Sequence, residues 1–172
     1  ALLDWVANHT AWDHSWVVDH PEWYTHDASG DIVTPTEDWT DVADLNYDRE
    51  PLREQMIEAM SWWVKETDID GFRCDVAEMV PYDFWNEATT TLQTIKPVLM
   101  LAEGEDPELH TVGFHMTYSS RLYGLLNRIA AGEAGSEPLS DYFFHEQYQY
   151  PPDALRMRFS SNHDENSWKG AA

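Results

Sequence analysis

Several apolar stretches of this sequence end in polar or charged residues, and this recurrence limits the possible folds more than any other feature. The polar ends are Asn8-His9, Arg73 with Asp75, Glu103, and Asn162-His163-Asp164. In a β/α barrel the strands all end on one face, so residues far apart in sequence meet there and tend to be catalytic when charged. The pattern therefore predicts one shared pocket.

The stretches alternate with segments of helical spacing. Apolar residues recur every three or four positions from Leu52 to Val64 and again from Phe84 to Ile95. The unbroken apolar run 97–102 is typical of a parallel strand covered on both faces. Further on, the pattern indicates strands over 114–118 and 155–159 and helices over 121–131 and 139–148. This alternation predicts an α/β chain with a parallel sheet.

Residues 10–50 interrupt the alternation. They are rich in Asp, His, Trp and Thr and show no sustained period, which indicates a long loop excursion of the kind that often carries function. Their His and Asp residues lack a compact ligand spacing such as His-x-x-x-His, so loop solvation is favoured over zinc binding.

Composition narrows the class of partner. The formal net charge of −22 repels phosphate backbones and anionic lipid surfaces, which argues against nucleic acid and membrane partners. A 42% hydrophobic fraction predicts a packed core. The single Cys74 excludes an internal disulfide. No signal peptide or membrane-spanning run is recognisable, so the compartment cannot be read from this sequence.

Three carboxylates are expected to meet at the strand ends, namely Asp75, Glu103 and Asp164. Like-charge repulsion separates the pKa values of such neighbours and can keep one protonated beside an ionised one. Arg73 precedes Asp75 by two positions on the same strand, so both side chains point to one face and the guanidinium can hold the carboxylate.

Five segments resemble signature regions of the α-amylase family of glycoside hydrolases, in the family's order. They are Asp4–His9, Ala43–Asn46, Gly71–Asp75, Ala102-Glu103 and Asn162–Asp164. The resemblance implies a partial (β/α)8 TIM barrel that covers about strands 3 to 7. Residues 1–9 and 51–172 would form the barrel part, with 10–50 as the inserted loop region after the third strand.

The resemblance also assigns catalytic roles. Asp75 matches the nucleophile that forms a glycosyl-enzyme intermediate, Glu103 the general acid/base, and Asp164 the third carboxylate that stabilises the transition state. Retention needs two carboxyl groups about 5–5.5 Å apart, one ionised and one protonated. Glu103, at the end of an apolar strand, is the better candidate for a raised pKa.

Three further residues match substrate-binding positions of the family, namely His9, Arg73 and His163. A lone histidine is more often structural, but His9 and His163 both lie in matched motifs, so substrate contact is favoured. The aromatic residues of the excursion either stack on glucose rings or form a small loop core, and core packing is the default for most of them.

The sequence departs from the family pattern after Asp75, where Glu78-Met79 replaces the Lys-His pair of many calcium-dependent amylases. The Lys binds sugar on the leaving-group side and the His carbonyl binds calcium, so neither property carries over directly. Asn8 matches a family calcium ligand, which leaves a Ca²⁺ site with oxygen ligands open. No organic cofactor is expected.

The expected function is retaining hydrolysis of α-1,4-glucosidic bonds in starch-like glucans. The alternatives are a cyclomaltodextrinase, an α-1,6-glucosidase or a transglycosylase of the same family, or an inactive truncated glucan-binding chain. A complete barrel takes about 250 residues. We therefore expect the 172 residues to be a piece of something longer that exposes sheet edges and is unstable or inactive alone.

Overall fold

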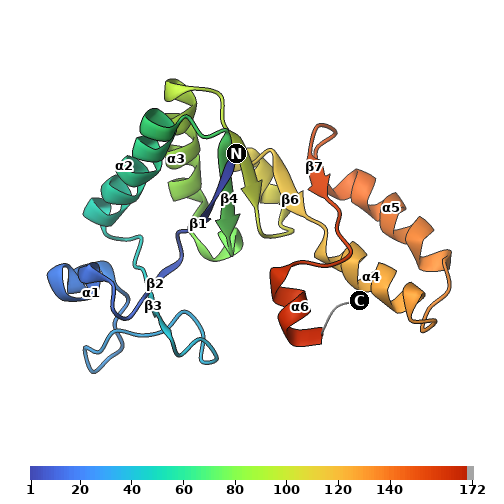
Figure 1. Ribbon diagram of the computed structural model, residues 1–172, viewed down its shortest axis with the longest axis horizontal. Coiled ribbons are helices and arrows are strands. Elements are labelled where there is room, and N and C mark those ends of the chain that lie inside the picture. The colour runs from blue at the N-terminus through green and yellow to red at the C-terminus, as the bar shows by residue number, and fades with distance from the viewer. Residues whose placement is uncertain (170–172) are drawn as a thin grey trace.

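The computed structural model describes residues 1–169 and is organised around a five-stranded sheet in which all neighbouring strands are parallel. The strand order is β1-β4-β5-β6-β7 (Figure 1). The bounds are β1 (Leu2–Val6), β4 (Gly71–Asp75), β5 (Leu99–Ala102), β6 (Met116–Tyr118) and β7 (Leu155–Met157). The predicted parallel α/β alternation is confirmed.

Helices connect the strands. They are α2 (Glu50–Thr67), α3 (Tyr82–Ile95), the 3-10 helix η3 (Pro107–Val112), α4 (Ser120–Ala130), α5 (Glu137–Gln149) and, after β7, α6 (His163–Lys169). Figure 1 shows α2 and α3 side by side along one part of the sheet and α4 with α5 at the other end. None of the described helices is long and apolar enough to cross a membrane.

The helix positions follow from the apolar spacing of the sequence. In α2, Pro51 lies in the first turn, where its missing N–H costs nothing, and Leu52, Met56 and Met60 are among the residues that face the core. The helix ends at Thr67, and the next residue, Asp68, adopts a left-handed conformation. In α3 the buried positions include Phe84, as the spacing predicts.

Strand β4 shows how the sheet orients the chemistry. Phe72 and Cys74 are fully buried in the core cluster, so Arg73 and Asp75 point to the opposite face of the strand. Gly71, at φ +154°, begins the strand where a Cβ would lie 1.9 Å from the carbonyl oxygen of Leu99. Only glycine therefore permits β4 and β5 to approach this closely.

The excursion 10–50 is more regular than its sequence indicated. It contains α1 (Ser15–Asp19) and the 3-10 helix η1 (Pro21–Trp23), and β2 (His9–Ala11) pairs with β3 (Val42–Asp44) in a separate antiparallel sheet. These elements are too short to produce a readable period. Trp23 and Tyr24 are buried, so for these two the loop-core alternative is confirmed.

Candidate active site

The guanidinium of Arg73 lies at the carboxyl ends of β4 and β5 and bridges two carboxylates. Its Nη1 donates to Oδ1 of Asp75 at 2.7 Å, and its Nη2 lies 3.0 Å from Oε1 of Glu103. The second contact is not aligned as a hydrogen bond, so this buried N–H has no hydrogen-bond partner among residues 1–169. The structure thus brings together Arg73, Asp75 and Glu103, and leaves a buried donor beside them.

Two partners of Arg73 were not among the residues singled out from the sequence. Nη1 also donates to Oδ1 of Asp4 at 2.9 Å, and Nε donates to the hydroxyl of Tyr118 at 3.2 Å. Asp4 pairs with Arg73 across β1 and β4, and Tyr118 ends β6. The polar Asp4 inside an apolar strand was the available signal. Burial lowers the pKa of Arg73, but these contacts outweigh it, and the guanidinium stays charged.

Glu103 is held by the backbone that follows Asp75. The amide of Val76 donates to Oε2 of Glu103 at 2.9 Å, and the amide of Ala77 donates to its carbonyl at 3.0 Å. Val76 has φ 37° and ψ 47°, a left-handed conformation that is unfavourable for a β-branched residue. Such strain costs about 1–3 kcal/mol and clusters at functional sites. Here it aims an N–H at a carboxylate.

The environment of Glu103 favours a protonated carboxyl. Burial raises the pKa of Glu103, the Val76 amide and Arg73 oppose this, and Asp75 raises the pKa further through its charge and a hydrogen bond between the two side chains. The net direction is upward. Two adjacent carboxyl groups, one of them biased toward keeping its proton, are the pair that general acid catalysis beside a nucleophile requires.

His9, just before the excursion, borders this group. It begins β2, and its ring centroid lies 5.6 Å from that of Trp39. Its imidazole also interacts electrostatically with Asp75. Burial lowers the pKa of His9, although Asp75 and two other aspartates act in the opposite direction. A neutral imidazole at this position can both donate and accept hydrogen bonds. Trp39 also lines a hollow of about 390 Å³ next to Glu103.

Asp164 and His163 lie on α6, after β7. Both are exposed, and Nε2 of His163 lies 3.2 Å from Oδ2 of Asp164. No hydrogen bond or ion pair within residues 1–169 joins Asp164 to Asp75 or Glu103. The meeting of the third carboxylate with the other two therefore stays a prediction.

Asn8 is buried beneath the excursion, with Nδ2 3.3 Å from Nδ1 of His9. Calcium takes six to eight oxygen ligands, usually with several carboxylates. The described residues contain no group of three or more His, Cys, Asp or Glu placed to hold a metal ion. The structure thus offers one buried amide without a carboxylate cage, and calcium binding stays a prediction.

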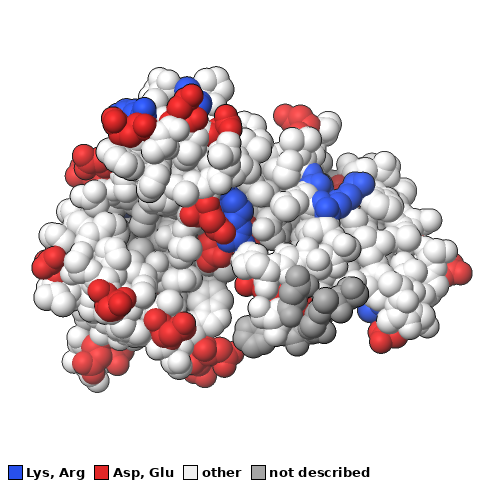
Figure 2. All heavy atoms as spheres, in the orientation of Figure 1, with Lys and Arg blue, Asp and Glu red and all other residues white. Residues whose placement is uncertain are grey.

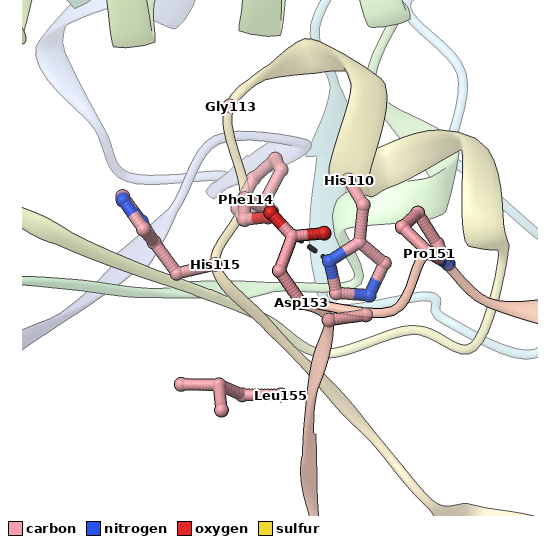
Figure 3. Close-up of a pocket in the computed structure, with 8 residues that line it drawn as sticks. His110, Gly113, Phe114, His115, Pro151, Asp153 and Leu155 are labelled. Carbon is pink, nitrogen blue, oxygen red and sulfur yellow. Dashed lines mark hydrogen bonds between the residues drawn. The ribbon is translucent and has the colours of Figure 1, made fainter. Parts of the chain in front are cut away.

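A second hollow, of about 250 Å³, lies at the opposite end of the strands, where β6 and β7 begin (Figure 3). His110 lines it, but Nδ1 contacts the Phe114 carbonyl at 3.1 Å and Nε2 contacts Oγ1 of Thr117 at 3.1 Å. The nearby His115 uses Nδ1 to accept from the amide of Met100. The ring nitrogens of His110 are thus occupied by the protein, as expected for a structural residue.

The charged side chains on the visible face are mostly acidic (Figure 2). Figure 2 shows acidic side chains spread around one face, with basic side chains confined to a few places, including the centre and the right of the view. The net charge of −22 favours neutral or cationic ligands over anionic ones. The arrangement of the site, with two carboxyl groups beside one guanidinium, suits a neutral polyhydroxyl ligand.

The chain is similar to known proteins in sequence and in structure. The family model described as "Alpha amylase, catalytic domain" matches residues 19–136. The chain is 28% identical to alpha-amylase MalA of Haloarcula japonica, over 97% of this chain and 26% of the relative. It is 31% identical to an alpha-1,4-glucan:maltose-1-phosphate maltosyltransferase of Myxococcus xanthus, over 83% of this chain and 24% of the relative.

The crystal structure of the maltogenic alpha-amylase AmyB from Thermotoga neapolitana superposes with a TM-score of 0.88 at 37% identity, covering 95% of this chain and 38% of that one. The expected partial barrel is thereby confirmed. The chain spans about a quarter of the length of the curated relatives above.

Proposed function

Because the chain belongs to the alpha-amylase family, we propose that it carries the nucleophile and the acid/base of a retaining glycoside hydrolase that acts on α-1,4-glucosidic bonds of starch-like glucans. The observation that supports this most is the single guanidinium of Arg73 bridging Asp75 and Glu103 at neighbouring strand ends. Directly interacting carboxyl groups suit retention, since inversion needs a gap of about 6.5–9.5 Å for a water molecule.

In the proposed reaction, the carboxylate of Asp75 attacks the anomeric carbon while the protonated Glu103 gives its proton to the leaving glycosidic oxygen. A water molecule then attacks the glycosyl-enzyme ester, and Glu103 takes the proton from that water. Arg73 orients Asp75 through the 2.7 Å hydrogen bond. His9 and His163 bind sugar hydroxyls, and Asp164 stabilises the oxocarbenium-like transition state.

Product analysis tests the proposal. The protein encoded by the complete reading frame that carries residues 1–172 is incubated with starch, pullulan and cyclodextrins. The proposal predicts α-anomeric maltooligosaccharides from starch in the first NMR spectra, before mutarotation. β-Anomeric products would disprove retention, and turnover of pullulan or cyclodextrins alone would move the assignment to an α-1,6-glucosidase or a cyclomaltodextrinase.

A transglycosylase is the second candidate, and the similarity to the maltosyltransferase of Myxococcus xanthus favours it. Transfer differs from hydrolysis only in the second step, where a sugar hydroxyl replaces water. Longer oligosaccharides formed from maltotriose at high concentration would identify it. A truncated glucan-binding chain is distinguished by sugar binding without turnover in residues 1–172, with turnover restored in the complete protein.

A calcium ion held in part by the Oδ1 atom of Asn8 remains part of the proposal. Calorimetric titration of the complete protein with Ca²⁺ is expected to give a binding isotherm that is weakened in Asn8→Ala. Absence of binding heat in the wild type would remove the metal.

A further inference from the structure

Glu78 is an acidic residue near the site that the proposed reaction does not use. It lies on the 3-10 helix η2 (Ala77–Met79), which directly follows β4. Its Oε1 accepts from the amide of Asp106 at 2.7 Å and also from the amide of Glu105. One carboxylate oxygen thus holds two consecutive backbone N–H groups of the loop after β5. Hydrogen bonds to an ionised acceptor are roughly twice as strong as neutral ones.

Gly104 shows how closely this side chain follows the loop. A Cβ at Gly104 would lie 2.8 Å from both Cγ and Oε1 of Glu78. The Glu78 side chain therefore crosses directly over the backbone between Glu103 and Glu105. A residue with a side chain at position 104 would displace it.

The two loops exchange hydrogen bonds in both directions. In the turn after β4, the amides of Val76 and Ala77 donate to Glu103. In the loop after β5, the amides of Glu105 and Asp106 donate to Glu78. Tyr82 adds a third link, since its hydroxyl donates to Oδ2 of Asp106 at 2.7 Å.

We propose that Glu78 is a positioning residue, which fixes the carboxyl group of Glu103 against Asp75 by anchoring the backbone of residues 104–106 to the turn after β4. The inference rests on the proposed function, because it concerns the acid/base of that reaction. A lysine at position 78 cannot accept these two N–H bonds. In this chain the departure from the Lys-His pair thus replaces a sugar contact by a backbone anchor.

Loss of the anchor is expected to change the pH dependence of kcat, which a general loss of stability would not do. The groups that face Glu103 are Arg73, Asp75 and the amide of Val76, and of these the Val76 amide depends on the fit between the two loops. That hydrogen bond lowers the pKa of Glu103. When the loops separate, the pKa of Glu103 rises, and the alkaline limb of the kcat profile moves to higher pH.

The experiment compares Glu78→Ala, Glu78→Lys and Glu78→Gln with the matched control Glu108→Ala in the complete protein, using maltooligosaccharide hydrolysis. Glu108 lies on η3, and its carboxylate has no hydrogen bond or ion pair to residues 1–169. We expect kcat to fall roughly 10- to 100-fold in Glu78→Ala and Glu78→Lys, with KM nearly unchanged and the alkaline limb raised. Glu78→Gln, whose amide oxygen still accepts, keeps most of the activity, and the control matches the wild type.

Hydrogen exchange gives a readout without activity. The amides of Glu105 and Asp106 are expected to lose protection in Glu78→Ala and to keep it in Glu108→Ala. If Glu78→Ala does not fold, Glu78→Gln against Glu78→Lys decides by the same exchange measurement. The anchor is disproved if Glu78→Ala and Glu78→Lys keep the amide protection of the control, or if their kcat falls without a shift of the alkaline limb. An inactive wild type with intact protection differences would instead disprove the proposed function.

Discussion

The part of the molecule before β6 and the part from β6 onward differ in how many apolar side chains they bury. Buried apolar side chains form one continuous cluster from Ala7 to Phe114. Beyond it, α5 has no buried residue, and Phe143, Phe144 and Tyr148 are exposed. We refer to residues 1–114 as the apolar half and to residues 115–169 as the polar half.

The polar half buries fewer apolar side chains, and a buried arginine pairs it with the apolar half. The guanidinium of Arg156, only 5% exposed, pairs with Glu105 at 3.0 Å and Glu146 at 3.2 Å, and lies 3.8 Å from the ring centroid of Tyr150. Buried ion pairs contribute little net stability, because desolvation offsets attraction. Asp75 and Glu103 stand on the apolar half and are fixed by several contacts. Asp164 lies in the polar half, and among residues 1–169 its one ion pair is with its neighbour His163.

The largest expected effect concerns the apolar half. In the complete protein, Asp75→Asn removes the nucleophile while preserving its shape, so kcat on maltooligosaccharides should fall by about 10⁴-fold or more. Steady-state kinetics measure this, with Glu108→Gln as a control that keeps wild-type rates. Activity within tenfold of the wild type would remove Asp75 from the mechanism.

The next effect tests whether the polar half contributes to the same site. Asp164→Asn should lower kcat by roughly 10²–10³-fold, the usual cost of losing one group that stabilises transition-state charge. Asp153→Asn, in the polar half but at the opposite end of the strands, should leave kcat unchanged. Equal rates in the two variants would show that the carboxylates do not converge.

Stability measurements compare the two halves directly. Phe84 is fully buried in the apolar half, so Phe84→Ala should lower the free energy of unfolding by about 3–5 kcal/mol. Phe144, which is 56% exposed on α5, should change it by no more than about 0.5 kcal/mol on substitution by Ala. Urea denaturation of the complete protein gives both values. A similar cost at both positions would mean that the polar half is covered by another apolar surface.

The smallest effect is the pH dependence of stability. The pKa of Glu103 is raised in the folded protein, so the folded state binds more protons than the unfolded state, and this contribution to stability is lost as pH rises. Relative to the wild type, Glu103→Gln should gain unfolding free energy between the unfolded pKa of about 4.3 and neutral pH. Urea midpoints at pH 4 and pH 7 measure the difference. A difference that is constant with pH would contradict the raised pKa.

The sequence predicted the sheet, because parallel strands that are covered on both faces keep uninterrupted apolar runs. It also predicted that Arg73 and Asp75 share a face, since residues two apart on a strand always do. It did not predict the contacts of Asp4 and Tyr118 with Arg73, which depend on register across strands. The sequence marked position 78 as a departure from the family pattern, but not the hydrogen bonds of Glu78 to residues 105 and 106 or the strained backbone of Val76, because these arise from the approach of two loops.

The close approach of β4 and β5 at Gly71 has a consequence at the far end of the strand. A methyl group there would overlap the Leu99 carbonyl and force the two strands apart at their beginning. Arg73 stands two positions along β4, and Glu103 follows β5 directly. Moving β4 away from β5 at this point would also move Arg73 and Asp75 relative to Glu103. A side chain at position 71 would thus disturb the reactive pair without contacting it.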